Sequence, residues 1–402
     1  MIMPGFILII LAAYALYALF SKAISRTIIT LPIVFMIFGY LISTPMQMSV
    51  DPGLLDEGKR LLAEITLILV LFSDASHVRF KRLLKNWKIP ARMLIIGMPL
   101  TILLGTAAVF SLNPESGLAM ALLTAALLTP TDAAIGQTVV SSPEVPEHLS
   151  QTVNVESGLN DGLVLPFVLL GAILASMAMS GHSTDGLATD AIIEIILGPL
   201  AGIAIGWGIA HAMDWAQNHD YMDESAGGVI FISTAFAAYL FADLIGGNGF
   251  IAAFVSGMVF GNTYRHDIHF ISEFMEGIGQ LLTISAFIMF GAFFLPVGLE
   301  HISYVSVTVA VLCLTIVRML PIFLSLTGSG LNTEQKLFLG WFGPRGLASI
   351  LFTLIIVDEF ELPNEGELMA CVTMTVALSI VLHGITALPL VKRISKNRAL
   401  PN

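Results

Sequence analysis

The feature that most constrains this chain is a succession of apolar runs, each about long enough to cross a bilayer. A transmembrane helix needs about 20 predominantly apolar residues, and a run that does not alternate with period two indicates a helix rather than a barrel strand. Charged residues make up only 12% of the chain, about half the share found in soluble domains. The sequence therefore predicts an all-α polytopic membrane protein. About thirteen transmembrane helices are expected, at residues 5–21, 28–44, 60–76, 90–112, 117–140, 150–178, 189–213, 226–245, 248–262, 279–297, 302–327, 335–357 and 367–391.

Lys and Arg are distributed unevenly between the two sides of such a bundle. The run "HVRFKRLLKNWKIPAR" falls on the same side as the tail "VKRISKNR", whereas Lys59 and Arg60 fall on the other side. Because cytoplasmic loops are enriched in Lys and Arg, we expect an outside N-terminus and a cytoplasmic C-terminus in the cell (inner) membrane. We expect a single transmembrane domain over 1–402, without a separate soluble domain.

Several functional classes receive no support from the sequence. No basic stripe could follow a phosphate backbone, so nucleic acid is not an expected partner. No His or Cys cluster lies within a span, which argues against zinc or copper. We expect no cofactor and no enzymatic activity. His383 lies alone within the last span, where a hydrogen-bonded histidine is favoured over a metal ligand.

The stretch "VNVESGLNDGLVLP" places polar groups within a predicted span. Ser157 lies four residues before Asp161, and Glu156 four before Asn160, so each pair shares a helix face. Hydrogen bonding between helices would explain Ser157 and Asn160. It does not require two carboxylates, and a charge inside a membrane is costly unless it is paired or hydrated. Glu156 and Asp161 are therefore candidate functional residues.

The stretch "LLTPTDAAIGQ" interrupts another apolar run. Pro130 removes a backbone donor and disfavours helix at Thr129. Carbonyls freed in this way must be buried in protein or line a cavity. A broken helix that also carries Thr131 and Asp132 is typical of transporters that coordinate small cations. The alternative is an ordinary proline kink in which Asp132 fastens a neighbouring helix.

A second interruption, "GPRG", surrounds Arg345 in the other half of the chain. Paired interruptions predict an inverted-repeat transporter with its site where the breaks meet, the halves covering roughly 28–178 and 226–391. The first half supplies three carboxylates and the second supplies Arg318 and Arg345. We expect an arginine to neutralise one carboxylate, because arginine stays charged. The remaining oxygen ligands suit a hard cation.

Five stretches carry a family resemblance: "TPTDAAIG", "ESGLNDG", "GGNGFIAAFVSGMVFGN", "IVRMLP" and "GPRGLAS". In this order they resemble the NhaP/NHE-type branch of the monovalent cation:proton antiporter superfamily, over most of the chain. The resemblance implies the NhaA/NhaP-like fold, in which two broken helices cross, and a homodimer in the lipid bilayer. It also implies exchange of Na⁺ or Li⁺ for H⁺, a function in sodium transport and pH homeostasis.

The resemblance assigns a role to each matching residue. Asp161 would be the carboxylate that binds either the cation or a proton, and alternating access would carry the occupied site across the membrane. Asp132, Ser157 and the Thr131 carbonyl would complete the Na⁺ site. Asn160 before Asp161 marks the branch that exchanges one cation for one proton electroneutrally.

The remaining implied roles are supporting ones. Glu156 would lie beside the ion, held by Arg345, while Arg318 would be a second structural or pH-related charge. Thr129 and Pro130 would shape the break. The family often reads Thr-Asp-Pro, whereas Pro130 here precedes the pair, which moves the expected break up to a turn earlier.

Other readings stay open. A K⁺/H⁺ or electrogenic antiporter of the same superfamily is the nearest, followed by a cation channel and an intramembrane aspartyl protease with two carboxylates that share a proton.

Gly158 stands where a bulkier residue is common and suggests a close helix approach. Asp74 is either a residue of the cytoplasmic mouth or a simple helix-end charge, and we favour the second.

Overall fold

The computed structural model describes residues 4–24, 30–49, 52–78, 87–132, 135, 142, 144–180, 187–223, 225–266 and 269–398. Residues 79–86 of the basic run and residues 133, 134 and 136 of "TPTDAAIG" lie outside them. Within the described residues the chain forms helices and no strand. The elements in chain order are α1 (Pro4–Ile24), α2 (Leu31–Ser49), α3 (Pro52–His77), α5 (Lys88–Arg92), η1 (Met93–Gly97), α6 (Met98–Leu112), η2 (Pro114–Ser116), α7 (Gly117–Leu127), α9 (Glu147–Ser180), α10 (Leu187–Asn218), α11 (Ala226–Leu244), α12 (Gly249–Thr263), α13 (His269–Met289), η3 (Phe290–Phe294), α14 (Leu295–Glu300), α15 (Tyr304–Leu314), α16 (Ile316–Ser325), α17 (Thr333–Trp341), α18 (Leu347–Glu359) and α19 (Glu365–Arg398).

The described helices have the length and composition of membrane spans. Seven of these segments are long and apolar enough to cross a bilayer. Shorter apolar helices accompany them at Leu8–Ser21, Leu31–Pro45, Pro114–Leu127 and Gly249–Thr263. Many large apolar side chains lie on the outside of the molecule, as expected where lipid rather than water surrounds a bundle. The predicted class, an all-α polytopic membrane protein, is confirmed.

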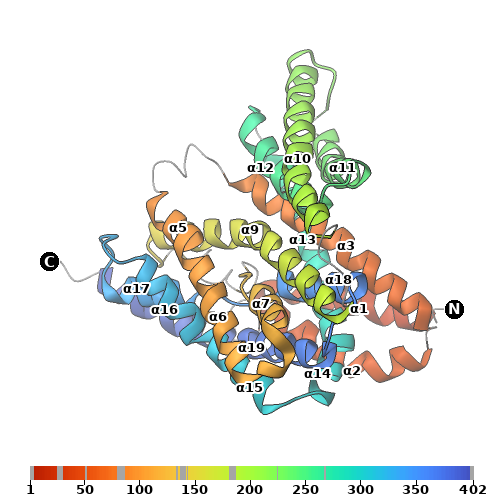
Figure 1. Cartoon of the computed structure of the whole chain (residues 1–402). Helices are drawn as coiled ribbons and strands as arrows, with labels where there is room; N and C mark the ends of the chain where they lie inside the picture. Colours follow the sequence, from red (N-terminus) through yellow and green to blue (C-terminus); the bar gives the residue numbers. More distant parts are fainter. Residues whose placement is uncertain are drawn as a thin grey trace.

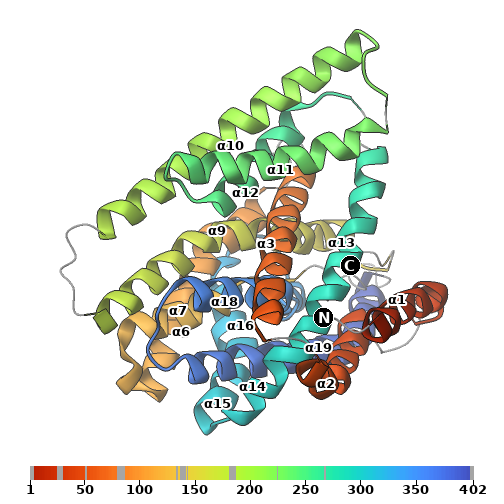
Figure 2. The ribbon, with the colours of Figure 1, turned by 90° about the vertical axis from the view of Figure 1, so that its right-hand side faces the viewer.

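The helices form two groups (Figure 1, Figure 2). One group contains α10, α11 and α12, which pack on one another and on α3. The other contains α6, α7, α9 and α15 to α19, where α6 packs on α7, α7 on α9 and α15 on α19. α3 also contacts α9 and α18, so it lies between the groups. In Figure 2 it crosses the region between α11 and α18.

Glycines allow α10 to pack closely against α12. Gly198, Gly202 and Gly206 recur every four residues and so lie on one helix face. A Cβ atom added at Gly202 would lie 2.5 Å from Ala252 O, and one added at Gly206 would lie 2.5 Å from Ser256 O. Small residues at such spacing let membrane helices approach until backbone meets backbone.

The predicted span 302–327 contains a bend that the sequence analysis did not anticipate. α15 and α16 meet at Thr315, whose φ of −115° and ψ of −96° are not helical. The Thr315 hydroxyl donates to Val311 O at 2.5 Å, and back-bonding of this kind often bends helices. α16, which carries Arg318, therefore leaves the axis of α15.

Candidate ion-binding site

The first helix interruption begins where α7 ends, at Leu127. Residues 128–132 are not helical, because Pro130 has no N–H with which to continue the helix. The hydroxyl of Thr129 donates to Ala125 O at 2.7 Å and closes the last turn. The segment and its polar side chains are buried. The predicted break is confirmed, and it falls around the proline.

The second interruption separates α17 from α18. α17 ends at Trp341, and residues 342–346 are not helical and fully inside the protein. The N–H of Gly343 donates to Trp341 O at 2.8 Å, which turns the chain directly after the helix. α18 then begins at Leu347. Both interruptions predicted from proline and glycine are therefore present.

Asp132 joins the two interruptions. Its backbone N–H donates to Pro344 O at 2.7 Å, and its Oδ2 accepts from the N–H of Leu347 at 2.8 Å. A carboxylate in this place caps the start of α18 and is favoured by the helix dipole. The Oδ2 atom of Asp132 therefore fastens a neighbouring helix, as the alternative interpretation expected. Its role as a cation ligand stays a prediction.

Arg345 reaches from the second interruption to the first. Its side chain is buried, and its Nη1 donates to the carbonyl oxygens of Thr129 and, at 3.0 Å, Pro130. Backbone carbonyls that leave a helix inside a membrane need a partner within the protein. Arg345 is this partner, and its guanidinium group therefore stabilises the first interruption.

Three polar residues of α9 meet the first interruption. The hydroxyl of Thr131 lies 3.3 Å from both Glu156 Oε2 and Ser157 Oγ. Asn160 Nδ2 donates to Thr129 O at 3.1 Å and to the Thr131 hydroxyl at 3.3 Å. The helix face predicted from the four-residue spacing is therefore confirmed for these residues, which bind α9 to the break.

Glu156 pairs with Arg318 rather than with Arg345. Arg318 Nη1 lies 2.8 Å from Glu156 Oε1, and both side chains are only 2% exposed. The implied pairing of Glu156 with Arg345 is wrong in this structure, because Arg345 donates to the carbonyls of the first interruption. An arginine does neutralise one carboxylate, as the residues predicted, but it is Arg318 from α16.

The second interruption also makes room for Arg318. A Cβ atom added at Gly343 would overlap the guanidinium group of Arg318. A Cβ atom added at Gly346 would overlap the carboxylate of Asp132. The two glycines of "GPRG" therefore let charged side chains lie directly against the backbone, in addition to breaking the helix.

Asp161 lies one turn beyond Glu156 on α9 and is 8% exposed. Its Oδ1 is fully buried, and no hydrogen-bond partner for it exists among the described residues. Glu156, by contrast, forms an ion pair with Arg318, and Asp132 accepts a hydrogen bond from the N–H of Leu347. The Thr131 backbone is within hydrogen-bond range of this carboxylate of Asp161, but a buried oxygen atom without a partner is still costly. Asp161 therefore has the surroundings of a group that takes up a proton or a cation.

α3 brings a further carboxylate to α9. Asp74 is partly exposed in the last turns of α3, within electrostatic range of Asp161 and Asp132. A Cβ atom added at Gly158 would lie 3.6 Å from Asp74 O, an ordinary contact. The close approach expected at Gly158 is instead at Gly162, where a Cβ would overlap the ring of Phe254. Asp74 lies in the last turn of α3, as favoured from the sequence for a helix-end charge, and a role at the cytoplasmic mouth stays a prediction.

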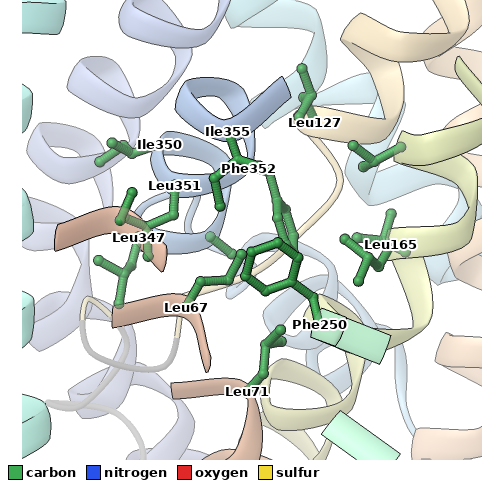
Figure 3. Close-up of a cluster of buried hydrophobic side chains, with 14 of the residues drawn as sticks. Leu67, Leu71, Leu127, Leu165, Phe250, Leu347, Ile350, Leu351, Phe352 and Ile355 are labelled. Carbon is green, nitrogen blue, oxygen red and sulfur yellow. The ribbon is translucent and has the colours of Figure 1, made fainter. Parts of the chain in front are cut away.

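A cluster of apolar side chains joins several of the helices that carry these residues (Figure 3). Leu165 of α9, one turn past Asp161, lies in it with Phe250 of α12 and Leu71 of α3. Leu347 and its neighbours on α18 complete the cluster, whose members are buried. The cluster therefore joins side chains from both helix groups.

The chemistry of the site is that of oxygen ligands. No group of three or more His, Cys, Asp or Glu side chains that could hold a metal ion occurs within the described part of the chain. The oxygens of Asp161, Ser157 and the interrupted backbone are of the kind that hard cations prefer. His383 lies apart from them and is hydrogen-bonded to Trp341 O at 3.0 Å, as predicted for a histidine of the bundle.

Comparisons with known proteins relate the chain to antiporters. The Na⁺/H⁺ antiporter NhaH of Halobacillus dabanensis is 27% identical over 345 residues, which cover 82% of each protein. The K⁺/H⁺ antiporter NhaP of Alkalimonas amylolytica is 23% identical over 339 residues, which cover 83% of this chain and 57% of that protein. The chain spans only 36–44% of the length of the yeast antiporters that it matches.

A solved structure shares the fold. The sodium proton antiporter MjNhaP1 of Methanocaldococcus jannaschii matches with a TM-score of 0.77 at 20% identity, over 95% of this chain and 100% of that chain. The family model for the transmembrane region of sodium/hydrogen exchangers matches residues 7–393. With its broken helices, its buried carboxylates and a family match over nearly its whole length, this chain belongs to the sodium/hydrogen exchanger family.

Proposed function

We propose that this protein exchanges Na⁺ or Li⁺ for H⁺ across the cell membrane, with Asp161 as the shared binding group. The observation that carries the proposal is the fully buried Oδ1 of Asp161, which has no partner among the described residues. Either a cation or a proton can neutralise this carboxylate, and each excludes the other. That competition couples the two fluxes. Asp132, Ser157 and the Thr131 carbonyl are the further ligands of the cation.

The charge of the site supports one-for-one exchange. Asp132, Glu156 and Asp161 face Arg318 and Arg345, all of them buried. Without the partly exposed Asp74, these three buried carboxylates and two guanidinium groups leave one negative charge, which a single monovalent cation or a single proton cancels. An empty site would carry that charge through the membrane at a cost of several kcal/mol. Electroneutral exchange follows, because only the loaded forms can cross.

Alternating access is the proposed route. The support is that an apolar cluster joins the two helix groups, so that a relative displacement of the groups would expose the site first on one side of the membrane and then on the other. We further propose that the two chain halves are inverted repeats, that the protein acts as a homodimer, and that its N-terminus faces the outside.

The second candidate is K⁺/H⁺ exchange. Its support is the similarity to a protein named as a K⁺/H⁺ antiporter. The same carboxylate would serve in both cases, since K⁺ is also a cation that takes oxygen ligands.

Liposomes that contain the purified protein test the proposal. A proton gradient is imposed, and internal pH is followed while Na⁺, Li⁺ or K⁺ is added, with and without a valinomycin clamp of the voltage. We expect Na⁺ and Li⁺ to dissipate the gradient equally with and without the clamp. A response to K⁺ alone would select the second candidate, and no response to any cation would contradict both.

Asp161→Asn is the decisive variant. The amide keeps the size of the side chain but cannot exchange a proton for a cation, so we expect exchange to fall to the level of empty liposomes. Glu147→Gln is the matched control, because Glu147 lies on the same helix and is exposed. It should exchange like the unchanged protein. Exchange retained in Asp161→Asn would show that another group carries the coupling.

A further inference from the structure

A polar face of α19 lies against the second interruption. Ser379, His383 and Thr386 are spaced by four and three residues and so share one side of the helix. Ser379 and His383 are fully buried. None of the three belongs to the ion-binding site described above, and each makes a hydrogen bond to the region around residues 341–345.

The bonds hold both ends of the interruption. The N–H of Arg345 donates to Ser379 Oγ at 2.6 Å. His383 Nε2 lies 3.0 Å from Trp341 O, while its Nδ1 lies 3.1 Å from Ser379 Oγ. The indole N–H of Trp341 donates to Thr386 Oγ1 at 3.0 Å. α19 thus supplies the acceptor for the N–H of Arg345 and a second partner for Trp341 O, which also accepts from the N–H of Gly343.

The held segment leads directly to the ion-binding site. Arg345, whose N–H is fixed by Ser379, donates through Nη1 to the Thr129 and Pro130 carbonyls. The preceding residue, Pro344, accepts from the N–H of Asp132 at 2.7 Å. A shift of the segment by a fraction of an ångström would therefore move the backbone and the carboxylate of the first interruption.

We infer that Ser379 and His383 are positioning residues for cation binding, because they fix the second interruption and, through it, the geometry of the first. The inference rests on the proposed exchange function and adds residues that touch no ion. Pairing both ends of a short non-helical segment with one long helix is the kind of support that holds binding groups within about 0.5 Å of their working geometry.

The first test measures the segment itself and needs no transport. Hydrogen exchange followed by mass spectrometry is applied to the purified protein, Ser379→Ala and His383→Ala. We expect faster exchange in peptides that cover 342–347, because the N–H of Arg345 loses its acceptor or the Trp341 end is released. Unchanged exchange there in both variants would overturn the inference.

Thr375→Ala is the matched control for this test. Thr375 is also a buried hydroxyl residue of α19, but its Oγ1 donates only to Cys371 O of its own helix, at 2.7 Å. It should leave the exchange of 342–347 unchanged. An equal effect of Thr375→Ala would show that any weakening of α19 loosens the segment.

The second test measures the apparent KM for Na⁺ in liposomes. Loss of a buried hydrogen bond that shapes the site should raise the KM about five- to tenfold in Ser379→Ala and His383→Ala, with a smaller change in the maximal rate. Ser379→Thr keeps the hydroxyl and His383→Gln keeps an N–H donor. The KM of both variants should therefore lie within about threefold of the KM of the unchanged protein.

The outcomes separate the two proposals. If the unchanged protein moves no cation, the proposed function fails, while hydrogen exchange still decides whether α19 holds the segment. A fall in maximal rate and melting temperature with an unchanged KM indicates a purely structural role and overturns the inference. A raised KM that the conservative variants restore supports it.

Discussion

At the scale of single residues, two ion pairs show how strongly surroundings decide the effect of the same contact. Glu156 and Arg318 meet at 2.8 Å with both side chains 2% exposed. Glu334 and Arg393 also meet at 2.8 Å, with side chains 28% and 73% exposed. Removing one partner of a buried pair leaves an uncompensated charge, whereas water screens the exposed one.

We therefore predict that Arg318→Gln destabilises the protein by about 3–5 kcal/mol. Arg393→Gln, its matched control, should cost less than about 1 kcal/mol. The double variant Glu156→Gln with Arg318→Gln should recover part of the loss, since no charge is left unpaired. The melting temperatures of the detergent-purified proteins show the order of stability of these variants. Equal melting temperatures for the two arginine variants would contradict the assignment of Arg318 to a buried pair.

At the scale of helices, packing depends on where a glycine faces. Gly202 and Gly208 lie on the same helix, α10. A Cβ at Gly202 would meet the backbone of α12, with Ala252 O at 2.5 Å, whereas a Cβ at Gly208 would meet nothing within 4 Å. The packing of α12 therefore requires a glycine at position 202, whereas a side chain at position 208 would have room.

Gly202→Ala should accordingly force α10 and α12 apart, at a cost of about 1–3 kcal/mol for overpacking. Gly208→Ala should be neutral or stabilising by up to about 1 kcal/mol, because alanine favours helix. Fluorescence-detected melting of the two variants makes the comparison. A Gly208→Ala protein that melts below Gly202→Ala would show that the helix approach has been misplaced.

At the scale of the whole molecule, the sequence predicts a basic and an acidic side of the bundle. Among residues predicted on the basic side, Arg92 Nη1 donates to Thr327 O at 2.7 Å, and the N–H of Arg265 donates to Asp214 Oδ1 at 3.0 Å. Among those predicted on the acidic side, Arg60 lies 3.1 Å from Asp358 amid acidic neighbours. The proposed orientation places the more basic side in the cytoplasm.

The orientation can be tested with two exposed tyrosines. Tyr304 is 76% exposed and Tyr221 is 73% exposed, and the proposed orientation places Tyr304 outside and Tyr221 in the cytoplasm. A membrane-impermeant maleimide should label Tyr304→Cys in intact cells and Tyr221→Cys only after permeabilisation. The native Cys313 and Cys371 are buried and should stay unlabelled. The reverse pattern would place the N-terminus in the cytoplasm.

Local sequence patterns were enough to predict the class of the fold and the kinds of residue at the site. Apolar runs, a proline at 130, the glycines around Arg345 and the spacing of Glu156 and Asn160 are local signals, and each acts through its own stretch of backbone. They predicted membrane helices, two interruptions and a polar face on α9, all of which the structure contains.

Which of these residues become partners depends on how the helices pack in three dimensions. From the sequence, either of two arginines could pair with Glu156. The bend at Thr315 and the space left by Gly343 allow Arg318 to form this ion pair. The sequence also could not show that Ser379 and His383 reach the second interruption. Such contacts join segments far apart in the chain, and their geometry depends on how every helix between them packs, which no local pattern encodes.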